Sequence, residues 1–232
     1  MGSVPYILLI AIISYLLGSV PTAVIISKLF YKSDIREQGS GNMGSTNTYR
    51  VLGVKWGIFV QVVDILKGYL AVTLIATTLG AGLIIPNATS FEDITLLKIM
   101  AGISAIIGHI FPVFAGFRGG KGINTATGML LGLVPTDVLI AFALFAIALL
   151  SSGYVSLGSI VAAFTIPGSL MLRYNVFGAD IPGYHILVYF SLSILVLVLF
   201  THRTNIKRIL SGTENKFQKL QIVKLKFKKG KE

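Results

Sequence analysis

Most of this chain consists of long apolar stretches separated by short polar segments. About 20 consecutive apolar residues suffice to cross a bilayer as a helix. The apolar segments cover residues 4–29, 54–79, 96–115, 123–134, 138–150, 155–172 and 184–200. The pattern therefore predicts an all-α polytopic membrane protein with seven apolar segments, some of them short.

The fourth and fifth apolar segments, residues 123–134 and 138–150, are shorter than a usual membrane span. Two arrangements fit them: two short or tilted helices, or one longer span interrupted by Pro135, Thr136 and Asp137. A proline would end one helix at this point, and Thr136 could cap the next. Hydropathy alone leaves both arrangements open.

The distribution of charge decides between these arrangements. The chain has 20 Lys and Arg against 9 Asp and Glu, and basic residues of membrane proteins gather on the cytoplasmic side. With seven helices and the N-terminus outside, the basic C-terminal tail lies inside, whereas a merged fourth span would place it outside. We therefore expect seven helices, N-terminus out and C-terminus in. The same side then carries other basic residues: Lys28, Lys32, Arg36, Arg50, Lys55, Arg118 and Lys121.

The composition excludes several classes of protein. Apolar residues make up 54% of the chain and charged residues 12%, with a mean hydropathy of +0.81, which excludes an ordinary soluble domain. Cysteine is absent, so disulfides and cysteine-based zinc or redox sites are excluded. Three scattered histidines offer little to a transition metal. We expect neither a metal nor another cofactor.

The first polar cluster, Gly39 to Arg50, reads GSGNMGSTNTYR and separates the first two apolar segments. Its glycines permit tight turns, and its hydroxyl and amide side chains can donate hydrogen bonds. Arg50 supplies a permanent cation where the second helix is expected to begin. Such a segment can wrap around a phosphate. Its composition is equally that of a flexible polar loop between two helices.

The second cluster, His109 to Gly122, reads HIFPVFAGFRGGKG. Gly119, Gly120 and Lys121 precede a predicted helix, so backbone N–H groups, a helix N-terminus and a lysine could converge on an anion. This is not a Walker A loop, because Lys121 is followed by Gly122 rather than by Ser or Thr. A short basic turn that obeys the positive-inside rule is the alternative. His109 is interpreted as a packing or hydrogen-bonding residue at a helix end.

Two further clusters are expected at the same membrane face. The segment Ser151 to Ser159 offers Ser156 as a site hydroxyl, although its small residues also suit close helix packing. The segment Thr201 to Arg208 places His202 and Asn205 three residues apart, on one helix face if the seventh helix continues. An ordinary basic flank at the end of a membrane span would look similar.

Asp64 and Lys67 lie inside the second apolar segment, also three residues apart. A charged residue at the centre of a membrane helix costs about 2.5–3.5 kcal/mol on insertion scales. We expect a structural ion pair that also orients polar residues of the first cluster.

Residues 217–232 are expected to form a basic cytoplasmic extension of a single transmembrane domain, residues 1–216. The extension alternates apolar residues with lysine, as in VKLKFKK, which predicts an interfacial segment on anionic lipid. Nucleic-acid binding is not expected, because no folded basic domain accompanies the extension. The sequence specifies no oligomeric state.

Taken in order, four motifs resemble those of the bacterial acyl-phosphate:glycerol-3-phosphate acyltransferases, small polytopic enzymes of phospholipid synthesis. The motifs are GSGNMGSTNTYR, HIFPVFAGFRGGKG, GYVSLGS and THRTNIKRILSGTENK, and the similarity extends to about Lys216. Four ordered motifs at expected helix ends are far more specific than any one of them. Met43 and Ser45 depart from the residues common in the family, but neither change removes a charge or a donor.

The resemblance implies transfer of a fatty acyl group from acyl phosphate to glycerol 3-phosphate. The products would be lysophosphatidate and inorganic phosphate, formed without coenzyme A or a metal. It further implies a multi-pass enzyme of the bacterial plasma (inner) membrane with its active site on the cytoplasmic side. Both substrates carry phosphate and one carries a lipid tail, which suits polar clusters gathered where cytosol meets bilayer.

Together, the residue patterns and the resemblance give a set of predicted site residues. Catalysis is assigned to Ser40, Arg50, Lys121, His202 and Asn205. Phosphate binding is assigned to Gly41, Asn42, Gly44, Thr46, Asn47, Gly119, Gly120, Gly122 and Ser156, and a supporting role to Asp64 and Lys67. As a hypothesis, the two glycine-rich clusters hold the acyl phosphate, while Arg50, Lys121 and His202 bind glycerol 3-phosphate. The proton acceptor is either His202 or a phosphate oxygen of the substrate.

A transporter or channel for a phosphorylated anion is the main alternative, since it would use the same basic and glycine-rich groups. A transporter needs polar groups near the bilayer midplane and a path to the outer face. In this sequence only Gln61, Asp64 and Lys67 approach that depth. The pattern therefore favours the enzyme.

Overall fold

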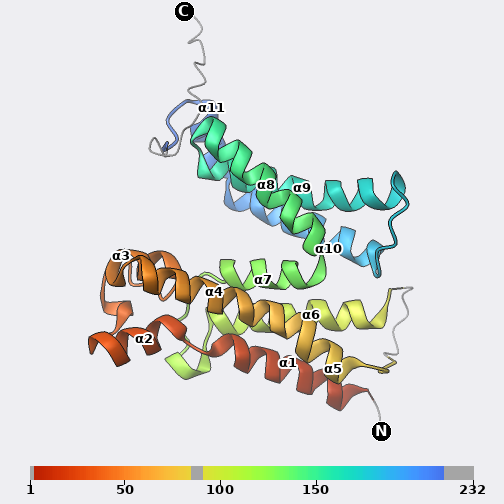
Figure 1. The fold of residues 1–232 in the computed structure, drawn as a ribbon, viewed down its shortest axis with the longest axis horizontal. Helices are drawn as coiled ribbons and strands as arrows, with labels where there is room; N and C mark the ends of the chain where they lie inside the picture. The colour runs from red at the N-terminus through yellow and green to blue at the C-terminus, as the bar shows by residue number, and fades with distance from the viewer. Residues whose placement is uncertain (1–2, 85–90, 217–232) are drawn as a thin grey trace, which may run out of the picture. The chain divides into compact units, whose positions relative to one another are not determined.

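Helices make up the regular structure of the computed structural model, which describes residues 3–84 and 91–216 (Figure 1). The chain divides into two compact units, Met1–Val134 and Pro135–Glu232, and each is described by itself. Among the described residues, six helical segments are long and apolar enough to cross a membrane, and Ile123–Leu133 is a shorter apolar helix. An all-α architecture is thus confirmed, whereas the orientation of its helices in the bilayer stays a prediction. The basic extension, residues 217–232, lies outside the described residues.

The first unit contains a set of packed helices and three short turns (Figure 1). Its helices are α1 (Val4–Ser19), α2 (Thr22–Tyr31), α3 (Ser45–Leu52), α4 (Val54–Leu70), α5 (Ala76–Gly80), α6 (Asp93–Ile110) and α7 (Ile123–Leu133). The 3₁₀ turns η1 (Ile35–Glu37) and η3 (Val113–Ala115) lie in the loops, and the π-helical segment η2 (Ala71–Ile75) joins α4 to α5.

The first apolar segment is not one helix, as the hydropathy pattern predicted, but two. Pro21 separates α1 from α2, because proline lacks the N–H of a helical hydrogen bond and its ring clashes with the preceding turn. Val20 adopts an extended conformation, with ψ at 112°. The break therefore leaves the Val20 carbonyl available to partners outside the helix.

Pairs of glycines bring the helices of this unit into backbone contact. Gly18 of α1 lies against the carbonyl of Ala105, and Gly108 of α6 lies against the carbonyl of Tyr15. The same reciprocal arrangement joins α4 to α7, where Gly68 faces the Thr125 carbonyl and Gly128 faces the Ile65 carbonyl. A Cβ at any of these glycines would overlap with backbone atoms, so small residues are needed for this approach.

The first polar cluster contains a helix that the sequence did not predict. Its second half forms α3, and Gly53, with φ at +88°, reverses the chain so that α3 packs on α4. The Tyr49 ring covers Gly57, and the Tyr49 hydroxyl donates to Gln61 Oε1 at 2.9 Å. Arg50 therefore lies in the last turn of α3, and its predicted place at the start of the second helix was wrong.

The second unit consists of α8 (Pro135–Ser152), α9 (Val155–Asn175), α10 (Tyr184–Thr201) and α11 (Arg203–Leu210) (Figure 1). Residues 123–134 and 138–150 do belong to separate helices, but Pro135 begins α8 instead of ending α7. Proline suits the first turn of a helix, where its missing N–H would have no partner. Because α8 already begins at Pro135, Thr136 lies inside the helix and the predicted cap at Thr136 was wrong. α8 is therefore longer than its apolar segment suggested.

A buried carboxylate ties α8 to α9. Asp137 accepts hydrogen bonds from Ser169 Oγ and Arg173 Nη1, each at 2.6 Å, and is fully buried. The rings of Tyr174 in α9 and Tyr184 in α10 stack, with 3.8 Å between their centroids. Aromatic and basic side chains of this kind are typical of the boundary between bilayer and water.

Candidate anion-binding site

The loop between α2 and α3 is fixed by one buried amide. Asn47, in α3, accepts a hydrogen bond from Ser40 N at 2.8 Å and donates to the carbonyls of Gln38 and Ile35 at 3.0 and 3.2 Å. Ile35 and Met43 are buried in the core on either side of the loop. The donors of Asn47 are used within the loop, so these contacts give it the role of shaping the loop.

Charged groups fasten the same loop to its surroundings. The Arg36 guanidinium binds Asp34 through two hydrogen bonds of 3.0 and 2.7 Å and donates to the Ala115 carbonyl of η3 at 2.6 Å. The hydrogen bond from Arg36 holds the pKa of the Asp34 carboxyl well below its usual range. Arg36 thus connects the loop between α2 and α3 to the second cluster, a function that sequence reasoning missed.

Two helix N-termini meet between the clusters. Gly44 caps α3, and its N–H is bound by Asn42 Oδ1 at 2.8 Å. Ser45, in the first turn of α3, accepts a hydrogen bond from Asn124 Nδ2 at 2.9 Å, and Asn124 lies in the first turn of α7. Each N-terminus offers unpaired N–H groups and a partial positive charge. Asn124 was missed, although its place directly after the glycine-rich turn was a usable signal.

Several predicted site residues of these two clusters present free side chains. Ser40, Thr46, Arg50 and Lys121 are exposed, and their side chains have no hydrogen-bond or ion-pair partner among residues 3–84 and 91–216. Gly41, with φ at +71°, forms the turn that precedes α3. Lys121 is a free cation directly before the N-terminus of α7, an arrangement that can bind an anion, whereas Arg50 lies at the other end of α3.

The glycine-rich turn of the second cluster lies directly on α6. The Gly120 N–H donates to the His109 carbonyl at 3.1 Å. Cβ atoms at Gly119 and Gly120 would overlap with the end of α6, while Gly122, with φ at +76°, caps α7. These glycines are needed for close approach to α6, and direct contact with a phosphate stays a prediction.

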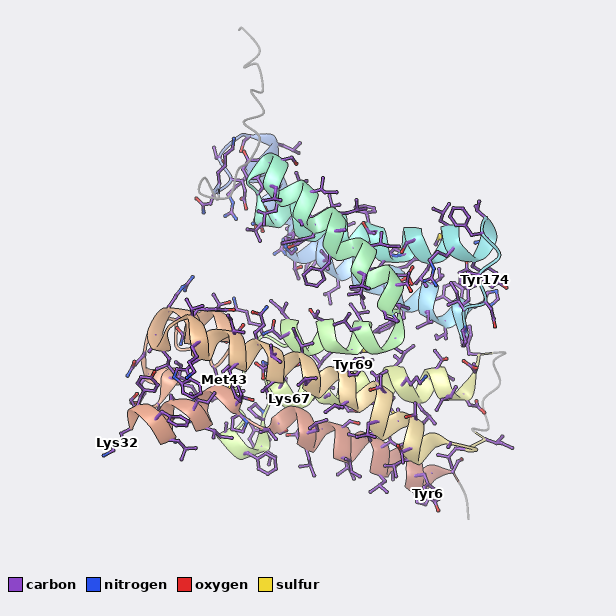
Figure 2. The ribbon with its side chains drawn as sticks, viewed as in Figure 1. Tyr6, Lys32, Met43, Lys67, Tyr69 and Tyr174 are labelled. Atoms are coloured by element: carbon purple, nitrogen blue, oxygen red, sulfur yellow. The ribbon has the colours of Figure 1, made fainter. Side chains whose placement is uncertain are left out.

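A buried ionic cluster lies deeper in the first unit, where Figure 2 shows Lys67 among the helices. The expected ion pair is present, since Lys67 Nζ lies 2.7 Å from Asp64 Oδ1. Lys67 also donates to the Val20 carbonyl at 2.5 Å, and His109 Nδ1 lies 3.7 Å from Asp64 Oδ1. The pair therefore contacts the α1–α2 break and the second cluster, not the first cluster as expected.

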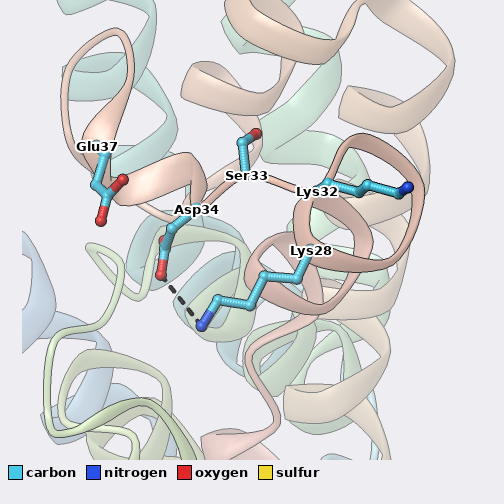
Figure 3. Close-up of a pocket in the computed structure, with 5 residues that line it drawn as sticks. All are labelled: Lys28, Lys32, Ser33, Asp34 and Glu37. Carbon is cyan, nitrogen blue, oxygen red and sulfur yellow. Dashed lines mark ion pairs between the residues drawn. The ribbon is translucent and has the colours of Figure 1, made fainter.

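A polar hollow of about 450 Å³ opens at the end of α2 (Figure 3). It is lined by Lys28, Lys32, Ser33, Asp34 and Glu37, and Lys28 lies 3.4 Å from Asp34 (Figure 3). Lys32 extends away from the end of α2 in Figure 2. The predicted phosphate-binding residues do not line this hollow. Within the described residues, 3–84 and 91–216, no group of three His, Asp or Glu side chains comes together as a metal site would require.

In the second unit, the structure gathers predicted residues around an acid that the sequence reasoning overlooked. Glu214 accepts hydrogen bonds from Asn205 Nδ2 at 2.8 Å, Ser156 Oγ at 2.9 Å and Arg208 Nε at 2.6 Å. The hydrogen bonds from Asn205 and then Arg208 lower the pKa of the Glu214 carboxyl. Glu214 belongs to the motif THRTNIKRILSGTENK, but its position in that motif did not indicate a function.

His202 lies between two helices, not within one. α10 ends at Thr201 and α11 begins at Arg203, so the condition under which His202 and Asn205 would share one helix face, a continuous seventh helix, is not met. His202 Nδ1 lies 2.9 Å from the Val198 carbonyl, which can only accept a hydrogen bond. Nδ1 therefore carries a proton, and Nε2 of the neutral ring keeps a free lone pair.

Together, these features define a class: a polytopic helical membrane protein that can bind an anion at the ends of its helices. Sequence comparison gives the family. Residues 8–212 match the family of proteins described as glycerol-3-phosphate acyltransferase. The chain belongs to this family, and it is an acyltransferase enzyme.

Known relatives cover nearly the whole chain. A glycerol-3-phosphate acyltransferase of Chlorobaculum tepidum is 42% identical, covering 90% of this chain and 95% of its own. Glycerol-3-phosphate acyltransferase 2 of Bacillus anthracis is 46% identical, covering 90% and 98%. Crystal structures of the integral membrane enzyme PlsY (YgiH), in glycerol 3-phosphate and lysophosphatidic acid forms, are 34% identical. Each superposes with a TM-score of 0.64 over 91% of this chain and 95% of that chain.

Proposed function

We propose that this enzyme transfers a fatty acyl group from acyl phosphate to glycerol 3-phosphate, giving lysophosphatidate and inorganic phosphate. The observation that carries the proposal is the meeting of two helix N-termini, joined by the Ser45–Asn124 hydrogen bond of 2.9 Å, between two glycine-rich clusters. The clusters also supply the free cations Arg50 and Lys121. Such a site suits the phosphate groups that both substrates carry.

The reaction follows from the chemistry of an acyl phosphate. A glycerol hydroxyl oxygen attacks the acyl carbonyl carbon, the bond from that carbon to the phosphate oxygen breaks, and phosphate leaves. An acyl phosphate is already activated, so no covalent intermediate on the enzyme is required. Arg50, Lys121 and the helix N-termini neutralise charge and align the substrates. The KM values of the Arg50 and Lys121 variants for each substrate should show which phosphate each cluster holds.

The hydroxyl proton must be transferred during the attack. His202 Nε2 can accept it, because Nδ1 is held in its protonated form by the Val198 carbonyl. The departing phosphate is the other acceptor. Ser40, Asn205 and Ser156 remain predicted site residues, and the bonds of Asn205 and Ser156 to Glu214 suit a role in holding the end of α11.

We further infer an orientation with the N-terminus out, the C-terminus in, and the site on the cytoplasmic side of a bacterial plasma membrane. The positive-inside rule supports this orientation, since the basic residues of both polar clusters fall on one side. The anionic-lipid contact proposed for residues 217–232 concerns a segment outside the described residues.

The donor is tested by offering purified enzyme glycerol 3-phosphate with either acyl phosphate or acyl-coenzyme A. We expect lysophosphatidate from acyl phosphate; product from acyl-coenzyme A alone would overturn the donor assignment.

Replacement of Arg50 or Lys121 by alanine is expected to lower kcat/KM by roughly two orders of magnitude, as loss of a positioned charge does. The control is Lys55→Ala, since Lys55 is an exposed cation of the same unit that lies over the Trp56 ring. Turnover in the Arg50 and Lys121 variants equal to that of the Lys55 variant would refute their assignment.

A further inference from the structure

Three buried ionisable residues of the first unit take no part in the proposed reaction. Asp64, Lys67 and His109 are each no more than 3% exposed. A buried ionic group is costly and needs a compensating structural or functional role. We propose that His109 is a positioning residue that holds the turn Gly119–Gly122 and, through it, Lys121 and the N-terminus of α7. This inference rests on the proposed phosphate site at that turn.

The turn Gly119–Gly122 contacts the imidazole of His109 directly. The Gly120 N–H donates to the His109 carbonyl, and a Cβ at Gly120 would overlap with His109 Nε2. The backbone of the turn therefore rests on the ring itself. Lys121 follows immediately, so a shift of the ring would displace the cation and the first N–H groups of α7.

The buried ion pair lies behind the imidazole of His109. His109 Nδ1 has no hydrogen-bond partner among the described residues and faces Asp64 Oδ1 at 3.7 Å. Asp64 is held by Lys67 at 2.7 Å, and Lys67 is held by the Val20 carbonyl at 2.5 Å. The cluster thus links α1, α4 and α6 to the underside of the turn. An apolar residue in place of His109 would leave this face of the Asp64 carboxylate without a polar neighbour.

Two adjacent glycines offer a matched test of this arrangement. A Cβ at Gly120 would overlap with the His109 side chain, whereas a Cβ at Gly119 would overlap with the backbone carbonyls of His109 and Ile110. Truncation of His109 can relieve the first overlap but not the second. The experiment therefore compares Gly120→Ala and Gly119→Ala, each alone and combined with His109→Ala, by steady-state kinetics of lysophosphatidate formation.

Each single glycine variant is expected to lower kcat/KM for glycerol 3-phosphate at least about tenfold, as a displacement of roughly 1 Å can do. His109→Ala alone is expected to raise the KM for one of the two phosphate substrates about fivefold or more, with kcat changed less. In the double variant His109→Ala with Gly120→Ala, kcat/KM for glycerol 3-phosphate should recover to within about threefold of the His109→Ala value. Such a recovery indicates strong coupling between neighbouring residues. The pair with Gly119→Ala should show no recovery.

Two outcomes would overturn the inference: a Gly120→Ala loss that is unchanged in the His109→Ala background, or a His109→Ala enzyme with both KM values equal to wild type. Thermal unfolding of each purified variant separates misfolding from misplacement. His109→Asn, whose side chain is shorter than imidazole and carries an amide N–H group that can donate, replaces the alanine variant if the latter does not fold. If wild type uses another acyl donor, the donor proposal fails, yet the same comparison can be run with that donor.

Discussion

At the scale of single residues, side-chain amides and carboxylates replace backbone pairing in the polar loops. Asn47 holds three backbone groups from Ile35 to Ser40, a segment that contains one short turn of 3₁₀ helix. Gly39, with φ at +60°, lies so close to Asn47 that a Cβ would overlap with Oδ1. The loop therefore has one shape because a single amide fits against it.

Replacing Asn47 by alanine should distort this loop. We expect a loss of roughly 1–3 kcal/mol in the free energy of unfolding, together with reduced turnover, because the Ser40 N–H loses its partner and the carbonyls of Ile35 and Gln38 each lose one of two hydrogen bonds. Asn47→Asp keeps the acceptor for Ser40 N but not the donors, so an intermediate effect is expected. Thermal unfolding and lysophosphatidate formation measure both. A variant with wild-type stability would show that the amide is dispensable.

Glu214 makes a prediction about pH. Its folded-state pKa lies below the ordinary value of 4.5, so its stabilising contribution is complete above that value and is lost as the pH falls through the lowered folded pKa. Wild type should be more stable than Glu214→Gln at pH 7, and the difference should shrink under acid conditions below about 4.5. Thermal midpoints of both proteins, measured at several pH values, test this. A difference that does not change with pH would contradict it.

At the scale of elements, the first unit depends on helices that touch through their backbones. Two pairs of helices, α1 with α6 and α4 with α7, each use one glycine from either partner. In a bilayer, close packing of this kind stabilises helix association where hydrophobic burial between helices contributes little. α4 carries the buried ion pair and α7 begins at the glycine-rich turn, so this packing also fixes the site.

Gly128→Ala should weaken the contact between α4 and α7. The added Cβ would overlap with the Ile65 carbonyl, and overpacking of this kind costs about 1–3 kcal/mol. The matched control is Gly168→Ala in α9, where a Cβ would have no heavy atom within 4 Å. Thermal unfolding in detergent should therefore separate the two variants. Equal midpoints would show that the α4–α7 contact tolerates a wider spacing.

The sequence predicted the helices well because membrane spans follow directly from composition and length. It did not predict where they are interrupted. Pro21 divided an apolar run with no change in hydropathy, Pro135 began a helix where it was expected to end one, and α3 formed within a segment rich in Gly, Ser and Asn. These features depend on backbone conformation and tertiary contacts, which apolar periodicity does not encode.

The candidate site was predicted by residue type more than by geometry. Arg50 and Lys121 are exposed cations, as their residue type suggests, and their contact with phosphate stays a prediction. Asn124 and Glu214 were missed, since each contacts a segment distant in the chain, and the approach of His109, interpreted as a helix-end residue, to Asp64 was not foreseen for the same reason. Spacing along one helix cannot reveal such contacts.

At the scale of the whole molecule, the inferred orientation can be tested directly because the natural chain has no cysteine. Single cysteines at Gln38 and Ser211, both exposed, are expected on the inside, and one at exposed Asp180 on the outside. In intact cells, a membrane-impermeant maleimide should label only Asp180→Cys. Labelling of the other two should require permeabilisation. The reverse pattern would invert the proposed orientation.

The break at Pro21 has a consequence for biosynthesis. The Val20 carbonyl that it frees is an acceptor for Lys67, and α1 enters the membrane before α4 because it comes first in the chain. Lys67 therefore follows its acceptor along the chain, while His109 comes later on α6. We expect α4 to be integrated poorly by the translocon when it is presented alone and well when α1 precedes it, so that the order of the helices in the gene is itself part of how these charges enter the bilayer.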